Sequence, residues 1–241
     1  GCGLYLVSDG KKLTGAYPSR NHPVSKGSLC VKGWNAYEFS NSAERLTHPL
    51  IKKDGKFLKA SWNEALSLIA GKFKDYQDKY GLDSLAFLSS AKTTNEENYL
   101  MMKLSRAVFK TNNVDHCARL CHASTVVGLA ATFGSGAMTN SINEFQDAQL
   151  ILITGSDTTA QHPLIGSRIV NAVIDKGAKL IVIDPREIEL AKYATIYARQ
   201  RNGSDVAWIN GLIHVIIEEG LCAKKFIEER TEGFEELKSL V

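Results

Sequence analysis

A cysteine and a histidine are adjacent at Cys121-His122, directly before an apolar run that predicts a helix from Ser124 to Phe133. The start of a helix favours the thiolate, which is the form of cysteine that acts as a nucleophile and binds metals. A buried structural cysteine beside a hydrogen-bonded histidine would have the same local sequence. The pair is therefore compatible with two interpretations: a cysteine that binds a metal or acts as a nucleophile, and a packed structural thiol. The rest of the sequence must decide between them.

The cysteines as a set favour metal or catalytic use over disulfides. They are odd in number and sparse: Cys2, Cys30, Cys117, Cys121 and Cys222. A disulfide framework is not expected in a chain of 241 residues, and metal or catalytic use is the usual alternative in a cytosolic setting. Considered one by one, Cys117 and Cys222 are interpreted as packed structural thiols.

The composition narrows the range of partners. A net charge of +3 is too small to argue for nucleic acid, although it suits a ligand that carries phosphates. No apolar run reaches the roughly 18 residues that cross a bilayer, so we expect no direct membrane insertion. The chain has 44% hydrophobic and 23% charged residues, which is typical of a globular protein with a core.

The elements that must position these residues follow from periodicity and caps. Residues 1–47 predict a small β-hairpin that turns at Asp9-Gly10. Ser61 and Glu64 form a capping box that opens a helix ending near Tyr80. Buried strands are predicted at 85–88, 150–153 and 180–183, and further helices at 96–109, 163–175 and 205–219, the last capped by Ser204. This alternation indicates an α/β fold with a parallel sheet covered on both faces.

Polar residues follow the predicted strands where ligands of open parallel sheets bind. The three loops are Gly155-Ser156-Asp157, Asp184-Pro185-Arg186 and Asn202-Gly203-Ser204-Asp205. A carboxylate there could accept from a ribose or a guanine, a guanidinium could pair with phosphate, and a helix start could bind an anion. Ordinary loops and a helix cap remain the alternative, since neither the dinucleotide nor the Walker glycine motif is present.

Several motifs together resemble one family. They are Gly1-Cys2-Gly3-Leu4, Cys30-Val31-Lys32-Gly33, the run from Asn113 to His122, the run from Gly136 to Glu144, Asp184-Pro185-Arg186, and the stretch from Asn202 to the end. The chain resembles, over essentially all its length, the large subunit of molybdenum- or tungsten-dependent formate dehydrogenases, within the bis-molybdopterin-guanine-dinucleotide oxidoreductase family. The implied fold is a small β-rich iron-sulfur segment followed by parallel-sheet α/β domains that bind the pterin dinucleotide.

The resemblance assigns roles to particular residues. Cys2 and Cys30 would be the third and fourth ligands of a 4Fe-4S cluster, and Cys121 would bind Mo or W through its thiolate. His122 would lie close to the substrate and accept a proton, and Lys32 would lie between the cluster and a pterin. The residues implied to contact the cofactor are Lys32, Gly155, Ser156, Asp157, His162, Asp184, Pro185, Arg186, Gly203, Ser204 and Asp205.

The resemblance also implies a domain organisation and departures from it. The expected divisions are an iron-sulfur segment at 1–47, part of an α/β domain at 48–116, and part of a molybdopterin-guanine-dinucleotide domain at 117–241. The first two cluster cysteines of the family are absent, so the segment is expected to be incomplete at its N-terminus and to hold no intact cluster in the family manner. We expect the chain to be part of a longer polypeptide.

The implied reaction converts formate to CO₂, two electrons and a proton, reversibly. Electrons would leave through the cluster to an electron-transfer subunit or a ferredoxin-like carrier. A cytoplasmic location is favoured and a periplasmic one stays open, as does the choice between Mo and W. Three alternatives remain: a nitrate reductase of the periplasmic type, in which Met usually replaces His122; a non-catalytic scaffold like the large subunit of respiratory NADH dehydrogenase; and a chain inactive by itself.

Overall fold

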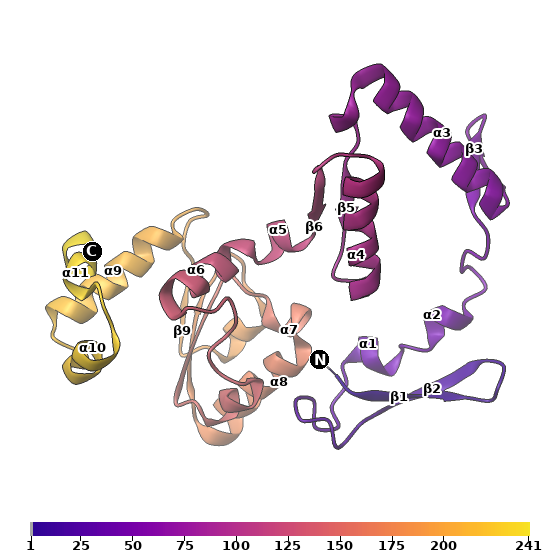
Figure 1. Ribbon diagram of the computed structural model, residues 1–241. Helices are drawn as coiled ribbons and strands as arrows, with labels where there is room; N and C mark the ends of the chain where they lie inside the picture. The colour runs from indigo at the N-terminus through magenta and orange to yellow at the C-terminus, as the bar shows by residue number, and fades with distance from the viewer. Residues whose placement is uncertain (1) are drawn as a thin grey trace. The chain divides into compact units, whose positions relative to one another are not determined.

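The computed structural model describes residues 2–241, which form two compact units (Figure 1). Unit 1 combines the chain up to Ala36 with Ser141–Val241, and unit 2 is Tyr37–Asn140. The chain thus leaves unit 1 after residue 36 and returns to it at residue 141. No local sequence pattern predicts this path. The boundaries of these units, after Ala36 and after Asn140, differ from the expected domain boundaries at 47/48 and 116/117. The expected boundaries separate cofactor-binding domains and stay predictions.

Unit 1 contains a hairpin, a parallel sheet and the helices around them. Its elements are β1 (Leu4–Ser8), β2 (Leu13–Pro18), α1 (Val31–Trp34), β7 (Leu150–Thr154), α7 (Thr158–Gln161), α8 (Pro163–Lys176), β8 (Lys179–Ile183), β9 (Ile196–Ala198), α9 (Asp205–Glu218), α10 (Lys224–Arg230) and α11 (Phe234–Leu240), with 3₁₀ turns at Ile142–Asp147 and Glu189–Tyr193. β1 and β2 pair antiparallel, as predicted, and Asp9 accepts hydrogen bonds from the backbone of Lys11 and Lys12 in the turn.

The sheet of unit 1 has the order β7-β8-β9 and is parallel throughout. Alternate residues of β7 and β8 point into one core with α8, since strand side chains alternate between faces. This core is formed by Ile151, Ile153, Ile169, Ala172, Ala178, Leu180, Val182, Ile188 and Leu190. α8 begins at Pro163 and ends at Gly177, whose φ of 70° is the left-handed conformation that favours glycine.

The expectation that the sheet is covered on both faces is wrong for unit 1. Leu150 and Leu152 of β7, which alternate with the core residues, are 58% and 45% exposed, and Ile196 of β9 is 54% exposed. Among the described residues, the buried cluster therefore lies on one face only. The apolar run of β7 has the composition of a strand buried on both faces. Composition does not determine which other elements pack on each face.

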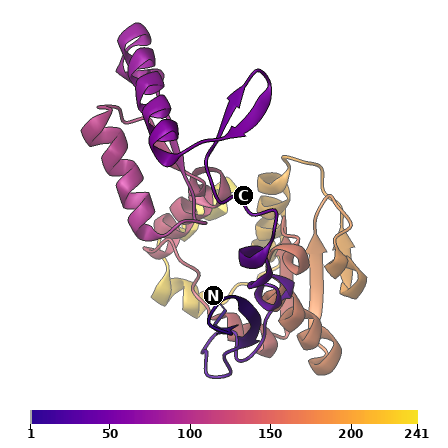
Figure 2. The same cartoon turned by 90° about the vertical axis from the view of Figure 1, so that its right-hand side faces the viewer.

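Unit 2 contains a second hairpin, which was not predicted from the sequence. Its elements are α2 (Glu38–Asn41), β3 (Leu50–Lys53), β4 (Lys56–Lys59), α3 (Trp62–Tyr80), β5 (Phe87–Ser89), α4 (Asn95–Lys103), β6 (Val114–His116), α5 (Ala118–Cys121) and α6 (Ala123–Phe133). The hairpin of β3 and β4 turns at Asp54-Gly55, both with positive φ, and Figure 2 shows it as a two-stranded ribbon before α3. An Asp-Gly pair between short strands is the signal that would have found it.

Two capping boxes and an aromatic cluster organise the rest of unit 2. The box of Ser61 and Glu64 starts α3 as predicted, and Thr94 and Glu97 form another at the start of α4. α4 continues into a π-helical turn at Leu104–Val108, within the helix predicted to end at residue 109. Phe73, Phe87 and Phe109 have ring centroids 5.3 to 5.9 Å apart, and they pack α3 against β5. Over residues 2–241, no helix combines the length and apolarity that a membrane crossing requires.

Candidate functional site

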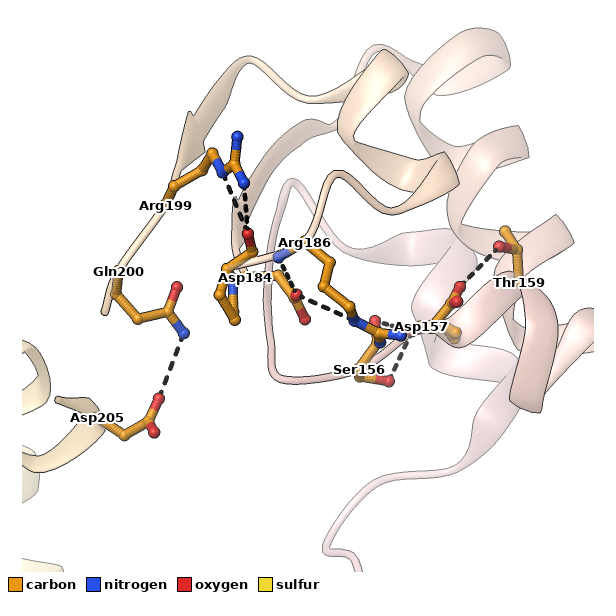
Figure 3. Close-up of polar contacts among 10 residues, drawn as sticks. Ser156, Asp157, Thr159, Asp184, Arg186, Arg199, Gln200 and Asp205 are labelled. Carbon is orange, nitrogen blue, oxygen red and sulfur yellow. Dashed lines mark hydrogen bonds and ion pairs between the residues drawn. The ribbon is translucent and has the colours of Figure 1, made fainter. Parts of the chain in front are cut away.

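The three predicted loops lie at the same edge of the unit 1 sheet (Figure 3). Gly155 follows β7, Asp184 follows β8 and Arg199 follows β9, and these strands are parallel neighbours. Their carboxyl ends therefore meet, and main-chain bonds join the loops: Gly155 N–H donates to Ile183 at 3.3 Å and Asp184 N–H to Ala198 at 3.2 Å. This is the edge at which open parallel sheets bind ligands.

Asp184 is the buried charged group of this edge. Its side chain is 3% exposed, and its Oδ1 accepts from the backbone N–H of Arg186 at 2.8 Å. The Nε of Arg186 lies 3.8 Å from the same oxygen, while the Arg186 side chain is 68% exposed. Asp184 therefore shapes the turn and orients Arg186, whose outer nitrogens remain accessible to an anion.

Hydrogen bonds connect the loop after β9 to the loop after β8. Arg199 donates from Nε and Nη2 to the carbonyl of Pro185, at 3.1 and 3.0 Å. Asp205 accepts from Gln200 Nε2 at 3.4 Å, and Gly203 has a φ of 78°. Gln200 Oε1 is buried without a hydrogen-bond partner in the described chain, so an acceptor is available there for a ligand N–H.

Ser204 differs from its predicted role as a capping side chain. It occupies the N-cap position of α9, but its hydroxyl donates to the Arg201 carbonyl at 2.7 Å instead of accepting from the helix. Its ψ of 11° departs from the extended backbone that a capping residue adopts, which explains the lost bond. The first N–H groups of α9 thus lack a side-chain cap.

An open recess of about 440 Å³ lies between the first two loops and is lined by Asp157, Thr159, Ala160, Arg186, Glu187, Ile188 and Glu189. Figure 3 shows the Arg186 side chain extending toward Ser156 and Asp157. The Ser156 and Thr158 hydroxyls lie 2.9 Å apart, and Thr159 donates to Asp157 at 3.4 Å. The lining offers one hydroxyl, three carboxylates and one exposed guanidinium: the carboxylates can accept from ligand hydroxyls, and the guanidinium can pair with a phosphate.

Close packing of two helices fixes the loop after β7. A Cβ added to Gly166 of α8 would lie 3.0 Å from Cα of Thr159 in α7, so only glycine allows this approach. α7 and α8 are joined through His162, which is exposed and whose carbonyl accepts from Ile165 and Gly166. The predicted ligand contact of His162 stays a prediction.

The predicted cluster residues Cys2 and Cys30 belong to unit 1. Cys2 is exposed and precedes Gly3, which bonds to the loop at residues 19–27: its N–H donates to Ser25 Oγ at 3.3 Å and its carbonyl accepts from Ser19 at 2.9 Å. Cys30 occupies the N-cap position of α1, and the nearby backbone N–H groups, first that of Gly33, lower the pKa of its thiol. The lowered pKa favours the thiolate that metals bind.

Lys32 follows Cys30 within α1 and is exposed. Over residues 2–241, no group of three or more histidine, cysteine or carboxylate side chains converges as a metal site. The expectation of an incomplete ligand set, based on the two cysteines of the cluster segment, stays a prediction.

Cys121 and His122 lie in unit 2, at the joint between α5 and α6. Cys121 ends the single turn of α5, and His122, with φ −145° and ψ 10°, interrupts the helix before α6 begins. Both residues are exposed, and α6 has no side-chain cap, so the predicted position before a helix is confirmed.

The strand before this joint is anchored from within unit 2. Asn113 donates to the carbonyls of Asp83 and Leu85 at 3.0 and 3.3 Å, and β6 pairs in parallel with β5. Arg119 donates to Asp115 at 2.9 Å and holds the pKa of that carboxyl below its usual value. These contacts fix the backbone that leads into Cys121.

Cys117 is not the packed thiol that the sequence suggested. It is exposed, and its sulfur accepts from the Ala91 N–H at 3.3 Å and lies 3.8 Å from His116 Nδ1. The turn between β6 and α5 places it at the surface, which its spacing of four residues from Cys121 could not reveal. Cys222 is half-buried and donates to the Ile216 carbonyl at 3.8 Å, as expected for a structural thiol.

Two family models match nearly the whole chain. The model described as molybdopterin oxidoreductase matches residues 45–236, and the one described as molybdopterin oxidoreductase Fe4S4 domain matches residues 1–42. The chain belongs to the molybdopterin oxidoreductase family. These two models indicate a molybdopterin cofactor and a 4Fe-4S cluster, as the sequence motifs predicted.

Similar members of the molybdopterin oxidoreductase family include formate dehydrogenases. The alpha subunit of the F420-dependent formate dehydrogenase of Methanocaldococcus jannaschii is 52% identical over all of this chain, and formate dehydrogenase H of Escherichia coli is 41% identical. The chain covers 35% and 34% of these relatives, so it spans about a third of their length. Acetylene hydratase from Pelobacter acetylenicus is similar in structure, with a TM-score of 0.74 and 29% identity over 99% of this chain and 33% of that one.

The residues present fit the cofactors of this family. The buried Gln200 Oε1 without a partner and the accessible Arg186 suit a pterin dinucleotide at the sheet edge, and the thiol chemistry of Cys30 suits a cluster ligand. Sequence analysis missed Arg199, Gln200 and Thr159. Arg199 and Gln200 follow β9, a three-residue strand that is too short to show a periodic pattern. Thr159 lies two residues beyond the predicted loop Gly155-Ser156-Asp157.

Proposed function

We propose that the chain is part of the catalytic subunit of a formate dehydrogenase. The observation that carries this is the exposed Cys121-His122 joint, within a chain whose curated relatives at 52% and 41% identity are named formate dehydrogenases. The similarity to acetylene hydratase, at 29% identity, is weaker evidence for a substrate. The fold alone does not choose between reactions.

Cys121 holds the metal in this proposal. A thiolate is a soft donor suited to Mo or W, and an exposed cysteine at a helix joint can reach a bound centre without unfolding its surroundings. When bound, the metal-pterin centre would supply the acceptor for the two electrons of formate oxidation. The chain's own contribution is to present one thiolate in a fixed direction, which the anchoring of β6 by Asn113 supports.

His122 accepts the proton in this proposal. Oxidation of formate, HCOO⁻, to CO₂ releases two electrons and one proton, and an imidazole is the side chain that most often takes up a proton in catalysis. The residue follows Cys121 directly and is exposed, so it is available to a substrate next to the metal. Neither nitrogen of His122 has a hydrogen-bond partner in the described residues, which leaves one free to accept.

The remaining predicted residues bind the cofactors, together with Gln200, which the structure adds to them. Asp184, Arg186 and Gln200 hold the pterin dinucleotide at the sheet edge, together with Gly155, Ser156, Asp157, His162, Pro185, Gly203, Ser204 and Asp205. Cys2 and Cys30 ligate the 4Fe-4S cluster, and Lys32 supplies a cation beside it. A bound cluster would supply the route for electrons to an electron-transfer subunit or a ferredoxin-like carrier, and the names of the F420-dependent relatives support F420 as a terminal acceptor. We place the reaction in the cytoplasm.

The experiment measures Mo, W and Fe per subunit and formate-dependent dye reduction in the intact subunit that carries this chain. We expect about one Mo or W per subunit in the parent protein. His122→Gln should retain metal but lose about 10²-fold or more of the turnover rate, the range that a general base contributes. His48→Gln is the matched control, because His48 is an exposed histidine of the same unit bonded only to Thr47.

Two results would reject the proposal. An intact subunit without Mo or W would favour the electron-transfer scaffold, and a loaded subunit that ignores formate but reduces nitrate would favour the nitrate reductase. If His122→Gln loses metal and activity in equal measure, His122 is structural and another group accepts the proton.

A further inference from the structure

Arg168 is a buried cation without a carboxylate partner among the described residues. It lies on α8, is 9% exposed, and forms no ion pair with any carboxylate of residues 2–241. Its Nη2 donates to the carbonyl of Val24, but its Nη1 is buried without a partner. An unbalanced buried charge lowers stability, so a group outside the described chain is needed to balance it.

The carbonyl of the residue before Val24 also accepts a hydrogen bond from a residue far away in the sequence of unit 1. Asn143 Nδ2 donates to the carbonyl of Pro23 at 3.3 Å, so two consecutive carbonyls accept from side chains more than a hundred residues away in sequence. We call the contacts of Asn143 and Arg168 with Pro23 and Val24 the clamp. It fixes the loop at residues 19–27 to the body that carries the pterin edge.

The clamped loop controls the position of Cys2. Ser25, which follows Val24 and is fully buried, accepts from the Gly3 N–H at 3.3 Å. A Cβ at Gly3 would lie 2.6 Å from the His22 ring, so the loop packs on Gly3 without free space. A shift of this loop must therefore move Gly3 and the adjoining Cys2.

We propose that Arg168 is a positioning residue for the iron-sulfur cluster. Through the clamp it holds the loop that places Cys2. A cluster ligated by thiolates is net negative and would offset the buried charge of Arg168. The inference rests on the proposed role of Cys2 as a cluster ligand and not on formate as substrate. Arg168 thereby couples folding of the pterin-binding body to formation of the cluster site.

The test uses the intact subunit with and without its cluster. Amide hydrogen exchange is followed at Ser25, Lys26 and Gly27, which donate within the loop, and iron release to a chelator is timed. Arg168→Met removes charge and donors but keeps apolar volume. Arg168→Lys keeps the charge, and Lys176→Met removes an exposed cation from the same helix as the matched control.

We expect Arg168→Met to exchange the loop amides and release iron about tenfold faster or more, because a hydrogen bond from a charged donor is lost. Arg168→Lys should release iron more slowly than Arg168→Met, and Lys176→Met should match the parent protein. Asn143→Ala should speed loop exchange without changing buried charge.

Two results would overturn the inference. One is loop exchange and iron release within twofold of the parent in Arg168→Met. The other is equal acceleration across the β7-β9 sheet, which would make Arg168 a packing residue of the whole unit. Failure to oxidise formate by a parent protein with a normal cluster would reject the proposed function and leave this inference intact.

Discussion

Replacing the buried Asp184 should cost far more stability than replacing an exposed aspartate that is also paired. Asp184 is 3% exposed and accepts the Arg186 N–H at 2.8 Å, and a hydrogen bond to a charged group contributes about 1.5–3 kcal/mol. The ion pair with Arg186 adds little, because that side chain is 68% exposed and its nitrogen is 3.8 Å away. We therefore expect Asp184→Ala to lower the free energy of unfolding by about 2 kcal/mol.

Asp147→Ala is the matched control. Asp147 pairs with Lys176 at 3.0 Å, but its side chain is 76% exposed, so its loss should cost about 0.5 kcal/mol or less. For a chain of this size these values correspond to melting temperatures lower by about 4–8 °C for Asp184→Ala and about 1–2 °C for the control. Asp184→Asn, which keeps an acceptor oxygen and loses the charge, should fall between them.

The assay is urea and thermal unfolding of the chain followed by circular dichroism, with amide exchange of Arg186 as the local probe. Faster exchange at Arg186 in Asp184→Ala would show that the carboxylate holds this turn. Equal destabilisation by Asp184→Ala and Asp147→Ala would refute the reasoning, since it would mean that burial does not strengthen the interaction.

Two further predictions concern glycine packing and pH. Gly166→Ala should destabilise the chain by about 1 kcal/mol, because overpacking against Thr159 exceeds the gain in helix propensity, whereas Gly71→Ala, where a Cβ meets no atom within 4 Å, should stabilise it by roughly 0.5–1 kcal/mol; the same sign for both in urea unfolding would contradict this. Arg119 lowers the folded pKa of Asp115, so its contribution to stability is present above the unfolded pKa of about 3.9 and is lost as pH falls through the lower folded pKa. The stability difference between the parent and Arg119→Met should shrink on acidification, and a difference independent of pH would exclude this ion pair as its cause.

Sequence predicted those elements whose signals are local. The capping box at Ser61, the proline and glycine that bound α8, and the apolar runs of β7 and β8 each act within a few residues, so their outcome did not depend on the rest of the fold. The Asp54-Gly55 hairpin carried an equally local signal and was overlooked. The strands β6 and β9 could not be found this way, because neither has the apolar run that predicted β5, β7 and β8, and each is held by pairing with a neighbouring strand.

For the site, sequence alone determined the kinds of chemistry: a cysteine beside a histidine at a helix start, and polar loops after two buried strands, in motifs that identified the family. Tertiary structure decided which of these groups meet. It brought the loops after β7, β8 and β9 to one edge, buried Asp184 while leaving Arg186 accessible, and set Arg168 against a loop 144 residues away. The physical reason is that residue type fixes what a side chain can donate, accept or ligate, whereas burial and partnership depend on contacts between segments that the local sequence does not specify.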